Sequence, residues 1–182
     1  EMLFTGAALL EKNKAMVDSL NVFPVPDGDT GTNMCMTMQS AVKEIKAADA
    51  RTVGEVAEAA SLGALKGARG NSGVILSQLF RGFARALKGA ETMDSEKFSD
   101  ALRQGVEAAY KAVMKPKEGT ILTVSRKMSE AVAQACKEGA NVYKLVDIAI
   151  TTGDSAVRVT PEELPILKEA GVVDSGGKGL MF

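Results

Sequence analysis

The amino-acid sequence predicts an all-α protein, a bundle or barrel of about eight antiparallel helices. Apolar residues recur at helical spacing along almost the whole chain, and no window alternates strictly between apolar and polar residues. Hydrophobic residues make up 46% and charged residues 25% of the 182 residues, which are ordinary values for a globular protein. The length and the absence of a linker-like stretch predict a single domain.

The first four helices are predicted from their apolar faces and their start signals. The first covers residues 3–20, and the second covers residues 34–45, after a glycine-rich stretch. Thr52 and Glu55 form a capping box that opens the third helix. The strongest apolar face lies at 75–87, directly behind a second glycine-rich stretch, and predicts the fourth helix.

The next three helices follow the same reasoning. Residues 98–113 predict a fifth helix that ends before Pro116. Residues 121–135 predict a sixth helix with Thr120 as its N-cap. A seventh helix begins at 142–149, and the apolar pattern does not define where it ends.

The end of the chain predicts a short eighth helix and the start of another. Thr160 serves as N-cap, Pro161 occupies the first helical position, Glu163 the third, and Gly171 ends the helix. A final apolar run reaches Phe182, so we expect the last helix to be cut off there.

The composition excludes several classes of function. Lys and Arg number 22 against 23 Asp and Glu, a net charge of −1, so no basic field favours nucleic acid or anionic lipid. Histidine is absent, which excludes Ser-His-Asp hydrolysis, His-ligated zinc and imidazole base catalysis. Catalysis must therefore use carboxylates, Lys or Arg, hydroxyls, or a metal on oxygen ligands.

The cysteines and the hydropathy pattern predict where the protein works. Cys35 and Cys136 are far apart in sequence and have no second cysteine at metal or redox spacing, so we expect reduced thiols. No apolar run is long enough for a transmembrane segment, and the N-terminus has no signal-peptide pattern. We expect a cytoplasmic protein.

Residues 21–33 carry the most chemical information. Two prolines hold the approach extended, and then Asp27 and Asp29 appear two residues apart, just before a helix. Residues i and i+2 of an extended segment can point the same way, so both carboxylates can converge on one cation. Mg²⁺ fits, because one or two carboxylates, waters and substrate phosphates usually hold it. Asn21 is a further oxygen donor or a partner of the ligands.

An EF-hand and a simple turn are two other interpretations of this segment. An EF-hand fails, because its fifth, sixth and twelfth positions would be Gly31, Thr32 and Met38. A simple turn, with Asp29 or Thr30 capping the next helix, stays open. It explains the cap but neither the second carboxylate nor the rigid approach.

Three more glycine-containing segments stand at predicted helix starts, at residues 67–73, 119–123 and 174–179. The first suits a phosphate, with Ser72 as hydroxyl donor, although tight packing between helices explains its glycines equally well. It lacks the P-loop pattern. Each of the other two alone indicates a cap. Together, the four starts indicate helix N-termini gathered around a metal-bound polyphosphate.

Three long motifs resemble the ATP-binding, N-terminal domain of bacterial fatty acid kinase. This DhaL-type domain is similar to the nucleotide-binding L subunit of dihydroxyacetone kinase. Where L subunits typically carry a histidine and an earlier aspartate, this chain has Thr30 and Asn21, which favours the fatty acid kinase branch. The motifs are residues 20–34, 67–78 and 171–179.

The resemblance implies a helical barrel with ATP or ADP and a pair of Mg²⁺ ions at one rim. It implies that Asp27 and Asp29 are catalytic metal ligands, and it leaves the role of Asn21 open. The residues that we place at the nucleotide on this basis are Thr30, Thr32, Asn33, Gly70, Asn71, Ser72, Gly73, Thr120, Asp174, Ser175 and Gly176.

The resemblance also implies an activity and partners. The kinase would transfer the γ-phosphoryl group to a fatty acid held on a separate, DegV-like carrier protein, giving an acyl phosphate in phospholipid metabolism. Residues 1–182 would be one domain of a longer multidomain chain, truncated at its C-terminus, with homodimer contacts in the other domains. Three alternatives remain: a dihydroxyacetone-type kinase, a module that keeps ADP as a fixed phosphate-relay cofactor, and a non-catalytic lipid-binding barrel.

Overall fold

A computed structural model describes residues 1–182 and confirms the all-α prediction, with nine helices and no strand. Seven of the helices are long, and the last two have six residues each. The helices are α1 (Met2–Ser19), α2 (Thr30–Ala47), α3 (Val53–Gly67), α4 (Gly70–Ala86), α5 (Ser95–Ala112), α6 (Ile121–Lys137), α7 (Val142–Glu163), α8 (Pro165–Ala170) and α9 (Ser175–Leu180).

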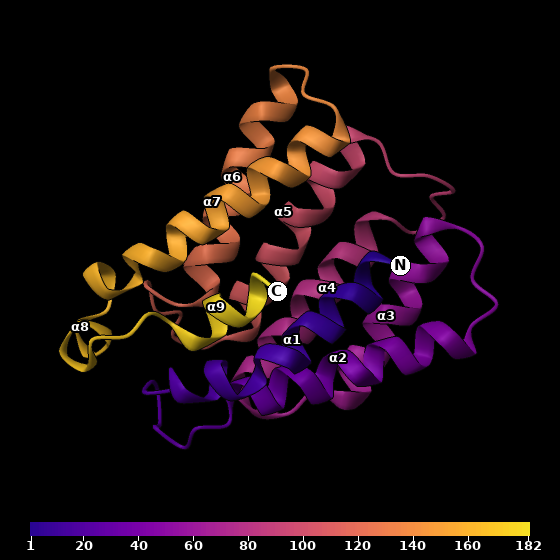
Figure 1. Ribbon diagram of the computed structural model, residues 1–182. Helices are drawn as coiled ribbons and strands as arrows, with labels where there is room; N and C mark the ends of the chain where they lie inside the picture. The colour runs from indigo at the N-terminus through magenta and orange to yellow at the C-terminus, as the bar shows by residue number, and fades with distance from the viewer.

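Helices that follow one another in sequence also pack against one another in space. The chain passes in this way from α1 to α7, and α9 returns to contact α1, α2 and α6 (Figure 1). The long helices thus surround a common interior, as the barrel expectation requires. The loop between α1 and α2, the short helix α8 and the start of α6 lie toward the same end of the molecule (Figure 1).

The helix starts show the side-chain caps that the sequence predicts. Thr52 accepts a hydrogen bond from the backbone N–H of Glu55 at 3.3 Å, and the Glu55 carboxylate accepts one from the Thr52 N–H at 3.0 Å. The predicted capping box is therefore confirmed. Thr120 caps α6, because its hydroxyl oxygen accepts from the Leu122 N–H at 3.4 Å.

The prediction that a helix begins at Thr160 is wrong. Helix α7 continues through Pro161 to Glu163, and α8 starts at Pro165 instead. Proline leaves the carbonyl four residues earlier without its usual donor, and here the Thr160 hydroxyl donates to that carbonyl, on Val157, at 2.7 Å. The predicted end of α8 at Gly171 is confirmed, with a left-handed φ of 69°.

Helices α4 and α5 approach each other most closely at two glycines. A Cβ atom at Gly82 would lie 2.0 Å from the carbonyl oxygen of Gln104 and 2.6 Å from the Cα of Gly105. A Cβ at Gly105 would lie 2.8 Å from the carbonyl oxygen of Leu79. Glycine is therefore required on both helices for this backbone-to-backbone contact.

The buried apolar residues form several clusters between the helices. The largest joins α1, α2, α4 and the first residue of α6, and another joins α5, α6 and α7. The helices bury one face each and expose the other, and none of them combines the length and apolar character needed to cross a membrane.

Candidate functional site

A polar cavity of about 620 Å³ lies where α2, α4, α6 and α9 begin. The structure thus brings together four helix N-termini that are far apart in sequence. The cavity is lined by all but two of the predicted site residues, namely Asn21, Asp27, Asp29, Thr30, Asn33, Gly70, Asn71, Ser72, Thr120, Asp174, Ser175 and Gly176.

A chain of side-chain hydrogen bonds links the start of α9 to the loop before α2. The Ser175 hydroxyl donates to the Thr30 hydroxyl at 3.2 Å, and the Thr30 hydroxyl donates to the side-chain Oδ1 of Asn21. The Asn21 amide nitrogen donates to Asp27 Oδ1 and to the backbone carbonyl of Val25, both at 2.8 Å. Asn21 therefore orients the Asp27 carboxylate, which fits its predicted use as a partner of the ligands.

Both carboxylates of the predicted pair face the cavity. Asp27 is exposed and accepts only the hydrogen bond from Asn21. Asp29 is the N-cap residue of α2, but its side chain makes no capping hydrogen bond. The chain contains no group of three or more His, Cys, Asp and Glu side chains that could hold a metal. A cation here would depend on these two carboxylates and on oxygens from other sources, a donor set that suits Mg²⁺.

The start of α4 contributes a glycine turn and two polar side chains. Gly70 has a φ of 58°, and a Cβ there would lie 2.4 Å from Asn33 Nδ2, so only glycine fits. Asn71 and Ser72 both line the cavity. Free backbone N–H groups at this helix start are suited to an anion.

Two predicted site residues, Thr32 and Gly73, do not line the cavity. The backbone N–H and hydroxyl of Thr32 both donate to the Asp18 carboxylate, at 2.9 Å, and so fasten α2 to the end of α1. A Cβ at Gly73 would lie 2.5 Å from the hydroxyl oxygen of Thr37 on α2. In the segment 67–73, Gly73 therefore packs closely against α2, as the helix-packing interpretation predicts, while Gly70 to Ser72 line the cavity.

Asp174 holds the starts of α6 and α9 together. It is 5% exposed, and its Oδ2 accepts from the Gly177 N–H at 2.6 Å. Burial raises the pKa of its carboxyl from 3.8 to about 6, although hydrogen bonds from the backbone of Gly177 and Ile121 oppose that rise. Asp174 is therefore a buried cap at the floor of the cavity.

We expect Asp174→Asn to change how stability depends on pH. Since the folded pKa is raised, the folded protein holds its proton between about pH 4 and 6, where the unfolded chain releases it. Ionisation therefore lowers the unfolding free energy over that window, by about 3 kcal/mol once complete. Asparagine keeps the cap and removes the titration. Denaturant unfolding of both proteins from pH 4 to 7 measures the difference, and parallel curves would contradict the prediction.

Sequence reasoning missed the loop between α5 and α6. Lys115, Lys117 and Met114 from this loop line the cavity, as do Phe23 and Val25 of the loop before α2. One signal was present, since both lysines flank the proline that follows α5, directly before a glycine-containing helix start. The sequence alone did not show that this loop reaches the same end of the molecule.

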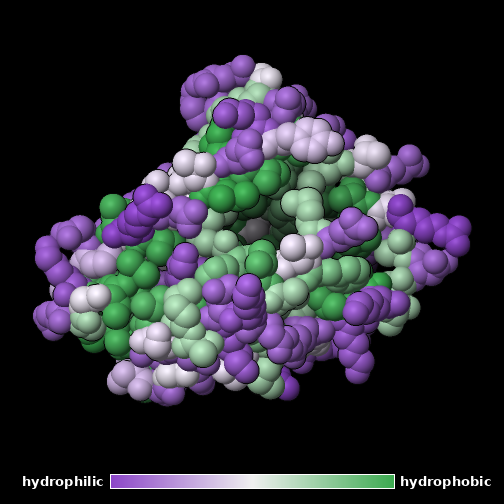
Figure 2. Space-filling model, viewed as in Figure 1, coloured by the Kyte–Doolittle hydropathy of each residue, from purple (hydrophilic) through white to green (hydrophobic).

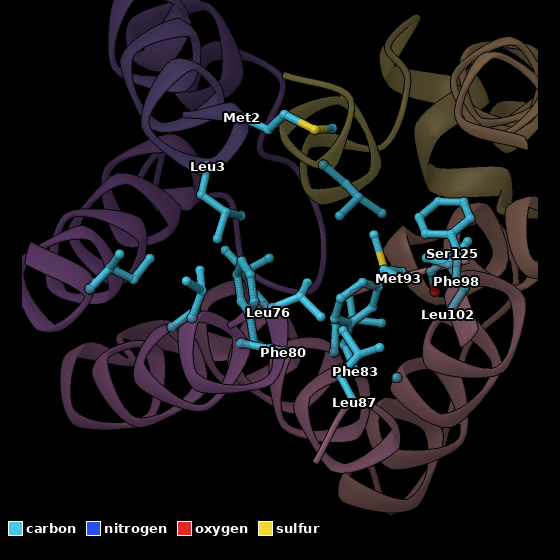
Figure 3. A pocket seen from close by; sticks show the side chains of 18 of the residues that line it. Met2, Leu3, Leu76, Phe80, Phe83, Leu87, Met93, Phe98, Leu102 and Ser125 are labelled. Atoms are coloured by element: carbon cyan, nitrogen blue, oxygen red, sulfur yellow. The ribbon is translucent and has the colours of Figure 1, made fainter. Parts of the chain in front are cut away.

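A second cavity, of about 490 Å³, lies inside the ring of helices, and 19 of its 22 lining residues are hydrophobic. Figure 2 shows an apolar hollow in the middle of one face of the molecule. The lining side chains come from most of the long helices and point into a common space (Figure 3). Those labelled in Figure 3 are Met2, Leu3, Leu76, Phe80, Phe83, Leu87, Met93, Phe98, Leu102 and Ser125.

The apolar cavity offers no group for binding a carboxylate. Its one hydroxyl, on Ser125, already donates to the Leu122 carbonyl at 2.9 Å. The polar cavity, in contrast, is lined by hydroxyl, amide and charged side chains.

These features define a class of protein, an all-α domain with a polar, anion-suited cavity where several helices begin. The DAK2 domain family matches residues 24–182, and the chain therefore belongs to that family. The family consists of kinase-related domains that bind ADP and ATP. Helix N-termini and polar side chains line the cavity, and both are suited to binding a nucleotide phosphate.

Similar proteins come from several bacteria. Protein YloV of Bacillus subtilis (strain 168) is 49% identical over 181 residues, which cover 100% of this chain and 33% of that protein. Uncharacterized protein SSP1546 of Staphylococcus saprophyticus is 49% identical over 180 residues, which cover 99% and 33%. Uncharacterized protein SAB1090 of Staphylococcus aureus is 48% identical over 181 residues, with 100% and 33% covered. The chain thus spans about a third of the length of these relatives.

Proposed function

We propose that this chain is the ATP-binding domain of a kinase that transfers the γ-phosphoryl group of ATP to a fatty acid held on a separate carrier protein. The observation that carries the proposal is the carboxylate pair, Asp27 and Asp29, on the wall of a cavity where four helices begin. Family membership supports the nucleotide. The resemblance to fatty acid kinase supports the acceptor.

The residues of the cavity would divide the work of holding the nucleotide. Asp27 and Asp29 would hold Mg²⁺, which supplies positive charge to the phosphate oxygens during transfer. Asn21 fixes the direction of Asp27 through the 2.8 Å hydrogen bond. The backbone of Gly70 to Ser72 and the Ser72 hydroxyl would donate hydrogen bonds to phosphate oxygens. Thr120, Ser175 and Gly176 would complete the wall at the other two helix starts.

The proposed reaction needs no general base. An oxygen of the acceptor carboxylate bonds to the γ-phosphorus while the bond from that phosphorus to the ADP oxygen breaks, giving an acyl phosphate and ADP. The carboxylate is already ionised at neutral pH, so no proton has to be removed from it. A chain without histidine is compatible with this reaction.

We also propose that the chain is one domain of a longer protein. The relatives, about three times as long, support this organisation. The docking site of the acyl carrier and any homodimer contact would then lie outside residues 1–182.

The test uses the full-length protein with ATP and Mg²⁺. We expect acyl phosphate to form with an acyl-loaded carrier and only poorly with free fatty acid, because a carrier aligns the carboxylate with the γ-phosphate. Rapid formation from free fatty acid by residues 1–182 alone would contradict the proposal.

Two further measurements separate the alternatives. Phosphorylation of dihydroxyacetone in place of the fatty acid would favour the dihydroxyacetone-type kinase. ADP that stays bound through gel filtration and does not exchange with ATP would favour the relay module. A kinase of the proposed kind exchanges both nucleotides freely.

A further inference from the structure

The loop between α5 and α6 brings positive charge to the polar cavity. Lys115 and Lys117 are the only cationic residues among those that line it, whereas Asp27, Asp29 and Asp174 are acidic. Neither lysine takes part in any of the ion pairs of the structure, which engage other Lys and Arg residues. Both ammonium groups are therefore available to a ligand.

A network of side chains holds this loop in place. Glu118 accepts hydrogen bonds from Arg126 at 2.8 Å, from Thr123 at 2.7 Å and from the Tyr110 hydroxyl at 3.2 Å. Arg126 also donates to the Tyr110 hydroxyl at 3.2 Å. The network thus joins the end of α5 and the first turns of α6 to the residue that follows Lys117.

The backbone of the loop is tied to α6 as well. The Gly119 N–H donates to the Thr123 hydroxyl at 2.8 Å, and the Thr120 hydroxyl donates to the Lys117 carbonyl at 2.7 Å. Partial burial opposes ionisation of Glu118, but the hydrogen bonds from Arg126 and Thr123 outweigh it and hold its pKa below the usual range. The network is therefore charged at neutral pH, and it fixes the C-terminal half of the loop.

We propose that Lys115 and Lys117 bind the terminal phosphate groups of the nucleotide, and that Glu118, Arg126 and Tyr110 position the loop that carries them. The inference rests on the proposed function, which places the nucleotide in this cavity. A polyphosphate beside two carboxylates keeps a net negative charge even with a pair of Mg²⁺ ions, and the two ammonium groups balance it. Lysine suits this task, because it binds phosphate as a point charge.

The test compares nucleotides of different phosphate number in the full-length protein. Calorimetry with Mg²⁺ gives the Kd of ATP, ADP and AMP for the wild type and for the Lys115→Ala/Lys117→Ala protein. We expect ATP affinity to fall roughly 10-fold or more, ADP affinity to fall less, and AMP affinity to stay unchanged. The salt dependence of ATP binding should also become weaker. Lys111→Ala, on α5 outside the cavity lining, is the matched control.

A double-mutant cycle tests the positioning role. Arg126→Gln alone should weaken ATP binding and leave AMP binding unchanged. Added to the double lysine variant, it should cause no further loss, because it acts through those lysines. Fully additive effects would overturn the positioning role.

ATP binding by the wild type and by the lysine variant distinguishes failure of this inference from failure of the proposed function. If the wild type binds ATP with Mg²⁺ and the lysine variant binds it equally well, this inference is overturned and the proposed function stands. An equal loss for AMP and ATP also overturns it, since the lysines would then support the fold or the nucleoside. If the wild type binds no nucleotide at all, the proposed function fails first.

Discussion

Asp29→Ala is expected to abolish Mg²⁺-dependent binding of ATP while the helical fold stays intact. Asp29 lines the polar cavity, and its side chain makes no capping hydrogen bond to α2. Its loss would therefore remove one of the two proposed cation ligands and little stability. A metal bridge is worth several kcal/mol, and about 3 kcal/mol corresponds to roughly 100-fold in affinity.

Calorimetry with Mg²⁺ and with excess chelator measures the effect, and circular dichroism checks the helices. Asp49→Ala is the matched control, because Asp49 is exposed and pairs only with Arg51 at the surface. Asp29→Asn should behave like Asp29→Ala, since it keeps the shape and loses the charge. Equal ATP affinity of the wild type with Mg²⁺ and with chelator would show that no metal bridge exists.

Gly82→Ala is expected to cause the largest loss of stability from a single methyl group. The new Cβ would lie 2.0 Å from the Gln104 carbonyl oxygen, so α4 and α5 would have to separate. Overpacking of this kind costs roughly 1–3 kcal/mol or more. A loss of that size lowers the Tm of a chain of this length by about 2–4 °C per kcal/mol.

Thermal unfolding followed by circular dichroism measures the loss. Gly6→Ala is the matched control, because a Cβ there has nothing closer than 3.5 Å and the residue lies within α1. Alanine should be neutral at that position or stabilise the helix by up to about 1 kcal/mol. An unchanged Tm of the Gly82 variant would show that the two helices adjust without cost.

Structural features that depend on a few neighbouring residues were predicted well from the sequence. The capping box of Thr52 and Glu55 and the cap of Thr120 need only local hydrogen bonds, and the structure contains both. The gathering of the glycine-containing helix starts was also predicted, because each start was suited to the same kind of anion. A shared chemical preference thus pointed to a shared location.

Structural features that depend on contacts between residues far apart in sequence were predicted less well. Thr160 has the local pattern of a cap, yet its hydroxyl donates to the Val157 carbonyl within α7. The same hydroxyl accepts a hydrogen bond at 3.0 Å from the backbone N–H of Asp174, 14 residues further along the chain. Thr32 lies in the most informative motif but is held by Asp18 on α1. Lys115 and Lys117 flank Pro116, but that local pattern does not place them, and only the path of the chain brings them to the cavity.

Helices α4 and α6 each run from the polar cavity to the apolar one. In α4, Gly70 lines the first and Phe83 the second, and in α6 the corresponding residues are Ile121 and Met128. Each helix has 17 residues and is about 25 Å long, and each contributes residues to the walls of both cavities. A substitution in the apolar cavity that tilts either helix would also displace the backbone N–H groups at its N-terminus in the polar cavity. A displacement of about 1 Å at a reacting centre can lower the rate of catalysis on the order of 100-fold.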